Sequence, residues 1–210
     1  MLSGNHDAHT ARRRKFGASA VINAVLAGIL IYWASNYTLL GFVEEEYHFP
    51  RDIWEAARSG STWQIGKFLA RGAKVNARDD MGHTPLLWTA NRNKLPAAKY
   101  LISRGADLNV NYYDETPLTD ALMKRNERMV ALLLDHGASV KTRDKIGRTP
   151  LIFLLSSSYI REDFRLVKLL VEHGADVNAR DKYKSSPLGY AQKYHYDEIA
   201  DYLRAHGAKG

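Results

Sequence analysis

The sequence predicts an all-α repeat solenoid that follows one N-terminal transmembrane helix. The first observation is a Thr/Ser-Pro-Leu phrase with spacings of 32, 33 and 37 residues, which begins at Thr84, Thr116, Thr149 and Ser186. The second is a Gly-Ala phrase with spacings of 33, 32, 37 and 33 residues, whose glycines are Gly72, Gly105, Gly137, Gly174 and Gly207. Two phrases that share a period near 33 indicate a repeat array. The third observation is a long uncharged stretch near the N-terminus.

Residues 17–43 are predicted to form a transmembrane signal-anchor helix. No residue from Phe16 to Val43 is charged, and about 20 apolar residues are enough to cross a bilayer as a helix. Aromatic side chains, which prefer the membrane interface, stand toward the far end of this stretch at Tyr32, Trp33 and Tyr37.

The charges that flank the span predict its orientation. Arg12, Arg13, Arg14 and Lys15 precede it, and three glutamates at 44–46 follow it. The positive-inside bias therefore places a basic tail, residues 1–16, in the cytoplasm. A linker, residues 44–50, and the repeats then lie on the extracytoplasmic side, which in a bacterial inner membrane faces the periplasm.

Other interpretations of this stretch remain open. A cleaved signal peptide needs small residues just after the apolar run, and the nearest candidate, Tyr32-Trp33-Ala34, has a bulky residue there. A buried soluble helix would have a polar face, which the stretch lacks. Asn23 beside a line of small residues permits weak self-association through the span. We favour the alternative interpretation of Asn23 as one tolerated polar residue in a long apolar helix.

Composition excludes several classes of protein. The chain contains no cysteine, so it forms no disulfide and carries no lipid-modified cysteine. The net charge is +7, of which residues 1–43 carry +3, and the charges of the repeats are interleaved. Nucleic-acid binding requires a basic stripe, so no nucleic-acid partner is expected.

Each full unit reads as a turn followed by two helices. Thr or Ser caps the first helix, and Pro fits its first position because it lacks the N–H that would be unpaired there. A second helix follows, with apolar residues at helical spacing, as in residues 129–134 and 166–171. It ends at a Gly, and turn-forming residues lead to the next unit.

This arrangement, with T-P-L at one end of each unit and G-A-D-V-N at the other, resembles the ankyrin repeat family over about Pro50 to Gly210. The resemblance implies a hairpin-like loop and two antiparallel helices per repeat, stacked into a solenoid in which neighbours bury one another. The repeat domain is expected at 51–210, with a capping repeat at 51–77 and repeats at about 78–110, 111–143, 144–180 and 181–210. Four extra residues in the unit 144–180 predict a longer loop between its helices, within 156–164.

No motif nominates a catalytic residue, and we expect no enzyme activity, cofactor or metal site. His136, His173 and His206 each stand just before the terminal Gly of a repeat, where a cation complements the negative end of a helix. We interpret them as structural rather than as metal ligands.

In the ankyrin family, partners bind the hairpin tips and the concave face of the first helices. Carried over residue by residue, the tips are Asp80, Met81, Tyr112, Tyr113, Lys145, Ile146, Lys182 and Tyr183. The matching positions on the first helices are Asn91, Arg92, Met123, Lys124, Ser156, Ser157, Lys193 and Tyr194. Beside the hairpins stand His83, Glu115, Arg148 and Ser185. The Tyr112-Tyr113 pair is the strongest single prediction, because exposed adjacent aromatics are costly without a use.

The function predicted from these features is a membrane-anchored protein-interaction module. One alternative is an immunity or inhibitor protein that neutralises an extracytoplasmic toxin or enzyme. Another is a structural assembly subunit of a membrane complex, in which the apolar helix packs against other subunits.

Overall fold

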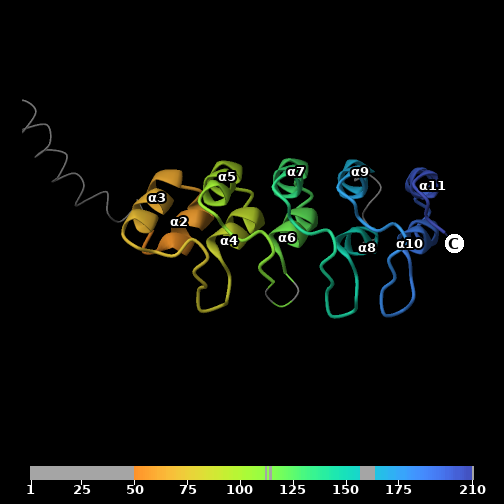
Figure 1. Ribbon diagram of the computed structural model, residues 1–210, viewed down its shortest axis with the longest axis horizontal. Coiled ribbons are helices and arrows are strands. Elements are labelled where there is room, and N and C mark those ends of the chain that lie inside the picture. Colours follow the sequence, from red (N-terminus) through yellow and green to blue (C-terminus); the bar gives the residue numbers. More distant parts are fainter. Residues whose placement is uncertain (1–49, 112, 114, 157–163, 210) are drawn as a thin grey trace, which may run out of the picture. The chain divides into compact units, whose positions relative to one another are not determined.

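The computed structural model describes residues 50–111, 113, 115–156 and 164–209, all of which belong to one compact unit from Pro50 to Gly210. The described residues form five helix pairs that stand in a row (Figure 1). The first helices of the pairs, which we call the inner row, are α2 (Ile53–Ser59), α4 (Pro85–Asn91), α6 (Pro117–Met123), α8 (Pro150–Leu155) and α10 (Pro187–Lys193). The second helices, the outer row, are α3 (Thr62–Ala70), α5 (Leu95–Ser103), α7 (Glu127–Asp135), α9 (Phe164–Glu172) and α11 (Asp197–Ala205).

The predicted membrane span, residues 17–43, and the tail, residues 1–16, lie outside the described residues. None of the helices that the structure describes is both long enough and apolar enough to cross a bilayer.

The inner row begins where the Thr/Ser-Pro phrase predicts. In α4, α6, α8 and α10 the Thr or Ser before Pro is the N-cap, and its hydroxyl accepts the backbone N–H three residues on. This bond satisfies one of the free N–H groups of the first turn, while Pro removes another. In α2, which lacks the phrase, the carboxylate of Asp52 takes the same role and accepts from the N–H of Glu55 at 2.7 Å.

Each outer helix ends before a glycine in the left-handed region, with φ between +81° and +95° at Gly72, Gly105, Gly137, Gly174 and Gly207. That conformation is easily reached only without a Cβ, which explains why the Gly of the Gly-Ala phrase recurs. After each of the first four glycines the chain turns away from the helix pair into the next hairpin.

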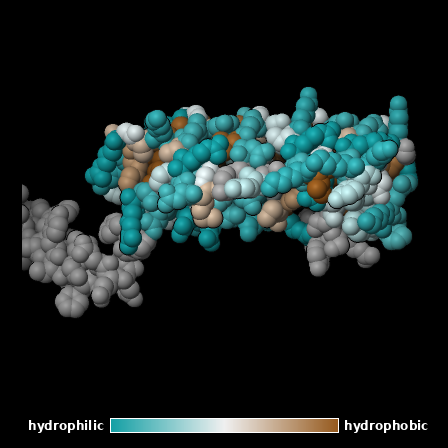
Figure 2. Space-filling model, turned by 90° about the horizontal axis from the view of Figure 1, so that it is seen from below, coloured by the Kyte–Doolittle hydropathy of each residue, from teal (hydrophilic) through white to brown (hydrophobic). Residues whose placement is uncertain are grey.

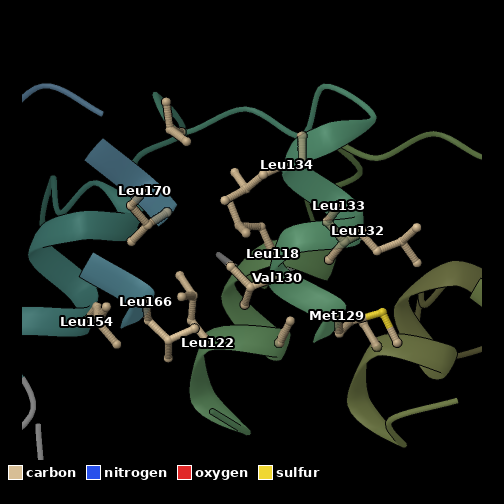
Figure 3. Packing of buried hydrophobic residues seen from close by; sticks show 14 of the residues in the cluster. Leu118, Leu122, Met129, Val130, Leu132, Leu133, Leu134, Leu154, Leu166 and Leu170 are labelled. Atoms are coloured by element: carbon tan, nitrogen blue, oxygen red, sulfur yellow. The ribbon is translucent and has the colours of Figure 1, made fainter. Parts of the chain in front are cut away.

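A continuous hydrophobic core joins the pairs and includes residues from Ile53 in α2 to Leu203 in α11. Figure 3 shows its middle, where leucines of α6 and α7 face Leu154, Leu166 and Leu170 of the following repeat. Because each pair packs against the next, no repeat buries its apolar face alone.

The extra residues of the unit 144–180 fall between α8 and α9. Helix α8 ends at Leu155 and α9 begins at Phe164, whereas three residues separate α4 from α5, α6 from α7, and α10 from α11. The insertion therefore lies between the helices of this unit, as predicted.

An asparagine ladder links consecutive repeats beside the outer row. Asn76, Asn109 and Asn178 each accept, at 2.8 Å, the backbone N–H of a residue about 30 positions on: Asp107, Ser139 and Lys209. Lys141 occupies the corresponding place in the remaining unit. The ladder explains the Asn of the recurring Gly-Ala phrase.

Candidate functional site

A hairpin leads into each of α4, α6, α8 and α10, and we number the four hairpins in that order. In the first, third and fourth hairpins, an aspartate stands five residues before the Thr/Ser-Pro phrase. One carboxylate oxygen of Asp79, Asp144 and Asp181 accepts the backbone N–H groups two and four residues on, at 2.8–3.1 Å. An arginine one position earlier donates to a carbonyl on the returning strand of the same loop: Arg78 to Gly82, Arg143 to Gly147, and Arg180 to Lys184. These bonds fix the tip residues between them.

The second carboxylate oxygen of each aspartate is held by a side chain beneath the hairpin. Trp88 donates to Asp79 at 2.8 Å, and Tyr190 donates to Asp181 at 2.7 Å. Burial and this bond raise the pKa of Tyr190 above its usual value. In the third hairpin Phe153 occupies the same position and cannot donate, so Arg148 donates to Asp144 at 2.7 Å and lies over the Phe153 ring.

The second hairpin has other residues at these positions. Val110 and Asn111 stand where the other hairpins have Arg and Asp, and Asp120 stands where they have an aromatic residue. Asp120 is 1% exposed, and one of its oxygens accepts from the Asn91 amide at 3.4 Å. Its other oxygen, Oδ1, has no hydrogen-bond partner. Burial, followed by the nearby Glu115 carboxylate, raises the pKa of Asp120 to about 6.

A row of apolar residues runs along the hairpin tips, three positions before the Thr/Ser of each repeat: Met81, Tyr113, Ile146 and Tyr183. Met81 is 56% exposed, and Tyr113 and Tyr183 are each 71% exposed. Figure 2 views this side of the molecule, where separate hydrophobic patches lie within a largely hydrophilic surface. We call these four residues the tip row.

A hollow of about 300 Å³ lies between the second and third hairpins, and residues of α6 and α8 also line it. Tyr113 and Met123 line it from one repeat, and Ile146, Arg148 and Phe153 line it from the next. Its remaining lining residues are Asn111, Glu115, Thr116, Thr119, Thr142, Arg143, Asp144, Lys145 and Pro150. The hollow, which we call the palm hollow, therefore combines apolar walls with charged residues of both signs, namely Arg143, Lys145 and Arg148 against Glu115 and Asp144.

The structure brings together six residues predicted from the sequence. Tyr113, Glu115, Met123, Lys145, Ile146 and Arg148 all line the palm hollow. Exposed positions elsewhere on the same side include Asp80, Arg92, Lys124, Lys182 and Lys193. Tyr112 and Ser157 lie outside the described residues.

Other predicted positions are engaged within the fold. The ring of His83 packs on Trp88 with centroids 5.0 Å apart and lies 3.7 Å from the Glu115 carboxylate. Tyr194 stacks on Tyr190, and Ser156 bonds to Arg148 at 3.0 Å. Ser185 donates its backbone N–H to Asp181 within the fourth hairpin.

Sequence reasoning missed Arg143, Thr119 and Phe153, which also line the palm hollow. An alignment of the four repeats could have identified two of these residues. Phe153 aligns with Trp88 and Tyr190, and Arg143 aligns with Arg78 and Arg180. Aligning the repeats at these positions separates the second hairpin from the other three.

The three histidines before the terminal glycines lie at helix C-termini. Nδ1 of His136, His173 and His206 is 2.8–2.9 Å from the carbonyl oxygen four residues earlier. This geometry fits the structural interpretation. Over the ranges that the structure describes, no three His, Asp or Glu side chains are grouped to hold a metal ion.

Comparison with known proteins agrees with this geometry. The family model described as ankyrin repeats (3 copies) matches residues 53–144 and 140–210. An ankyrin repeat domain-containing protein SAT10 of Stachybotrys chartarum is 36% identical over 98 residues, 46% of this chain and 5% of that protein. A putative ankyrin repeat-containing protein of Treponema pallidum is 33% identical over 94 residues, 44% of this chain and 32% of that protein.

Human ankyrin repeat and SOCS box protein 11 is 26% identical over 117 residues, 56% of this chain and 36% of that protein. The chain thus spans about a third or less of the length of these relatives. Since the family model covers more than half of the chain, the protein belongs to the ankyrin repeat family, whose repeats form protein-interaction modules.

Proposed function

We propose that this protein is a membrane-anchored module that captures a protein partner with its tip row and palm hollow. The observation that carries the proposal is that four of the five exposed large hydrophobic side chains among the described residues lie on this side. They are Met81, Tyr113, Met123 and Tyr183. Large exposed apolar groups gathered on one side of a soluble domain favour a binding surface.

The palm hollow is the proposed anchor point of that surface. Its walls, Tyr113, Met123 and Phe153, suit an aromatic or aliphatic side chain of the partner. Asp144 is paired with Arg148, which leaves Arg143 and Lys145 against Glu115 on the rim. The fourth hairpin adds exposed basic residues at Lys182 and Lys184. We therefore expect an apolar side chain flanked by carboxylates in the partner.

Anchoring is proposed from residues 17–43, which carry no charge. Attachment to a membrane raises the effective concentration of the domain for a partner in the same membrane or beside it. The flanking charges favour an extracytoplasmic repeat domain. A compartment-sensitive reporter fused after Gly210, with protease access in intact and opened cells, tests this orientation.

Site-specific photo-cross-linking in cells tests the capture itself. A photoreactive amino acid replaces Met123 in the palm hollow, and a control replaces Arg128, which is exposed on α7 in the outer row. We expect one discrete cross-linked protein at position 123 that is absent at position 128. Identical products at both positions, or none at position 123, would contradict the proposed site.

A further inference from the structure

The outer row carries a second exposed surface, centred on Trp63. Trp63 in α3 is 66% exposed, and it is the fifth exposed large hydrophobic side chain of the described residues. Lys67 and Ala70 stand four and seven positions further on, are exposed, and share its face of the helix. The Lys67 ammonium lies 4.5 Å from the centroid of the Trp63 ring. An aromatic ring and a cation are therefore presented together to solvent.

Helix α5 extends this surface. A shallow, largely open depression is lined by Thr62, Trp63, Gly66, Lys67 and Tyr100. Gly66 permits the close approach of the two helices here, because a Cβ at this position would lie 2.7 Å from the Tyr100 hydroxyl oxygen. The Arg104 guanidinium lies 4.9 Å from the centroid of the Tyr100 ring.

We call the resulting surface the basic aromatic face, formed by Trp63, Lys67, Arg71, Lys99, Tyr100 and Arg104. Helices α3 and α5 and their C-cap residues contain four basic residues and no acidic one. The acidic residues of the first pair, Asp52 and Glu55, belong to α2 and its N-cap, in the inner row.

The other end of the outer row has the opposite charge. Helix α11 carries Asp197, Glu198 and Asp201 against one basic residue, Arg204. Glu198 occupies the place of Trp63 in the second helix of its repeat, and Ala205 occupies the place of Ala70. The outer row has a further pair of this kind, since the Lys168 ammonium of α9 lies 4.2 Å from the centroid of the Phe164 ring, but both of these residues are half-buried. Trp63 and Lys67 of α3 are both exposed.

We propose that the basic aromatic face rests on an anionic phospholipid surface. The proposal builds on the membrane anchoring proposed above. Trp and Tyr side chains favour the bilayer interface, and lysines and arginines are attracted to anionic headgroups. The length of the linker favours a membrane as the binding partner of this face, because its seven residues, 44–50, span at most about 25 Å when fully extended. Helix α3 belongs to the first repeat after that linker, which favours this repeat over the later ones for contact with the membrane.

The full chain offers a direct test because it has no native cysteine. Ala70→Cys and Ala205→Cys place single thiols at matched, exposed ends of α3 and α11. Each variant is labelled with a polarity-sensitive fluorophore and reconstituted into phosphatidylcholine vesicles with or without phosphatidylglycerol. Quenching by lipids with brominated chains then reports contact of the label with the bilayer.

We expect strong quenching at position 70 in phosphatidylglycerol vesicles, little in pure phosphatidylcholine, and little at position 205 in either. Added salt reduces the signal, because it screens attraction between exposed charges. In the Ala70→Cys background, Lys67→Gln and Lys99→Gln each lower the ratio of lipid-contacting to water-exposed label by about fivefold. Equal quenching at positions 70 and 205, or the absence of quenching at position 70, would overturn the proposal. If an acidic protein, and not lipid, shields the label at position 70 from water, the binding partner of this face is a protein. That result would also overturn the proposal.

Flotation of the same vesicles after an alkaline carbonate wash reports the anchor separately. Retained chain with an unquenched label at position 70 refutes the lipid-facing surface and leaves anchoring intact. Released chain that is quenched at position 70 before the wash refutes anchoring and leaves the lipid-facing surface intact.

Discussion

The ammonium of Lys145 lies 5.2 Å from the centroid of the Tyr113 ring, so a cation of the third hairpin contacts an aromatic ring of the second. The third and fourth hairpins are joined as well, because the backbone N–H of Lys182 donates to the carbonyl of Ile146 at 2.9 Å. Arg143 adds a bond to the carbonyl of Arg180 at 2.8 Å. Three consecutive tips therefore support one another, and the palm hollow lies between two of them.

Gly147→Ala is expected to destabilise the repeat domain by about 2 kcal/mol or more. Gly147 has φ +79°, and a Cβ there would lie 3.3 Å from the backbone nitrogen of Lys182. An L-residue in this region costs about 1–2 kcal/mol, and the contact with the neighbouring hairpin adds to that cost. Gly137→Ala is the matched control, since Gly137 has φ +91° and no atom within 4 Å of the added Cβ. Urea denaturation of residues 50–210 measures the free energy of unfolding of both variants. Equal losses of stability would show that the contact of residue 147 with the fourth hairpin adds nothing to the cost.

Lys141→Asn is expected to stabilise the domain by about 0.5–1.5 kcal/mol, the usual net value of a hydrogen bond. The change supplies the missing member of the asparagine ladder, in which Asn178 accepts the N–H of Lys209 at 2.8 Å and donates to the Gly207 carbonyl at 3.0 Å. The reverse change, Asn109→Lys, removes a bond to the Ser139 N–H and should lower the melting temperature. A Lys141→Asn variant that melts at or below the original temperature would refute this role of the ladder.

Asp120→Asn is expected to remove a pH dependence of stability. The pKa of Asp120 is raised from 3.8 to about 6, first by burial and then by Glu115. Between these two pKa values the folded state binds more protons than the unfolded state. The free energy of unfolding therefore falls as the pH rises from about 4 to about 6. At pH 7 the variant should be more stable by about 1 to 3 kcal/mol.

Denaturation series at pH 4, 5, 6 and 7 measure this effect. Asp80→Asn, at an exposed tip position, serves as the control and should keep the original pH profile. If Asp120→Asn also keeps that profile, another group causes the pH dependence.

Local rules were enough to predict the helices. Thr84 and Thr116 cap them through a bond to an N–H three residues on, and such a bond depends only on neighbouring residues. The alignment of this sequence with ankyrin repeats then placed Tyr113 and Met123 on one surface. The palm hollow itself required the structure, because it depends on contacts between residues more than 30 positions apart, such as Tyr113 with Lys145. The basic aromatic face was missed for the same reason, since it joins Trp63 to Tyr100 across two repeats.

The most direct test of the proposed binding site compares two matched tyrosines. Tyr113 and Tyr183 occupy the same place in their hairpins and are each 71% exposed, yet only Tyr113 lines the palm hollow. Once photo-cross-linking at position 123 has identified the partner, its Kd is measured for Tyr113→Ala and for Tyr183→Ala, with circular dichroism as the check on folding. We predict that Tyr113→Ala weakens binding at least about tenfold and Tyr183→Ala less than about threefold, because hot spots lie in central, desolvated pockets. Equal losses for the two variants, or no loss for Tyr113→Ala, would contradict the claim that the palm hollow anchors the partner.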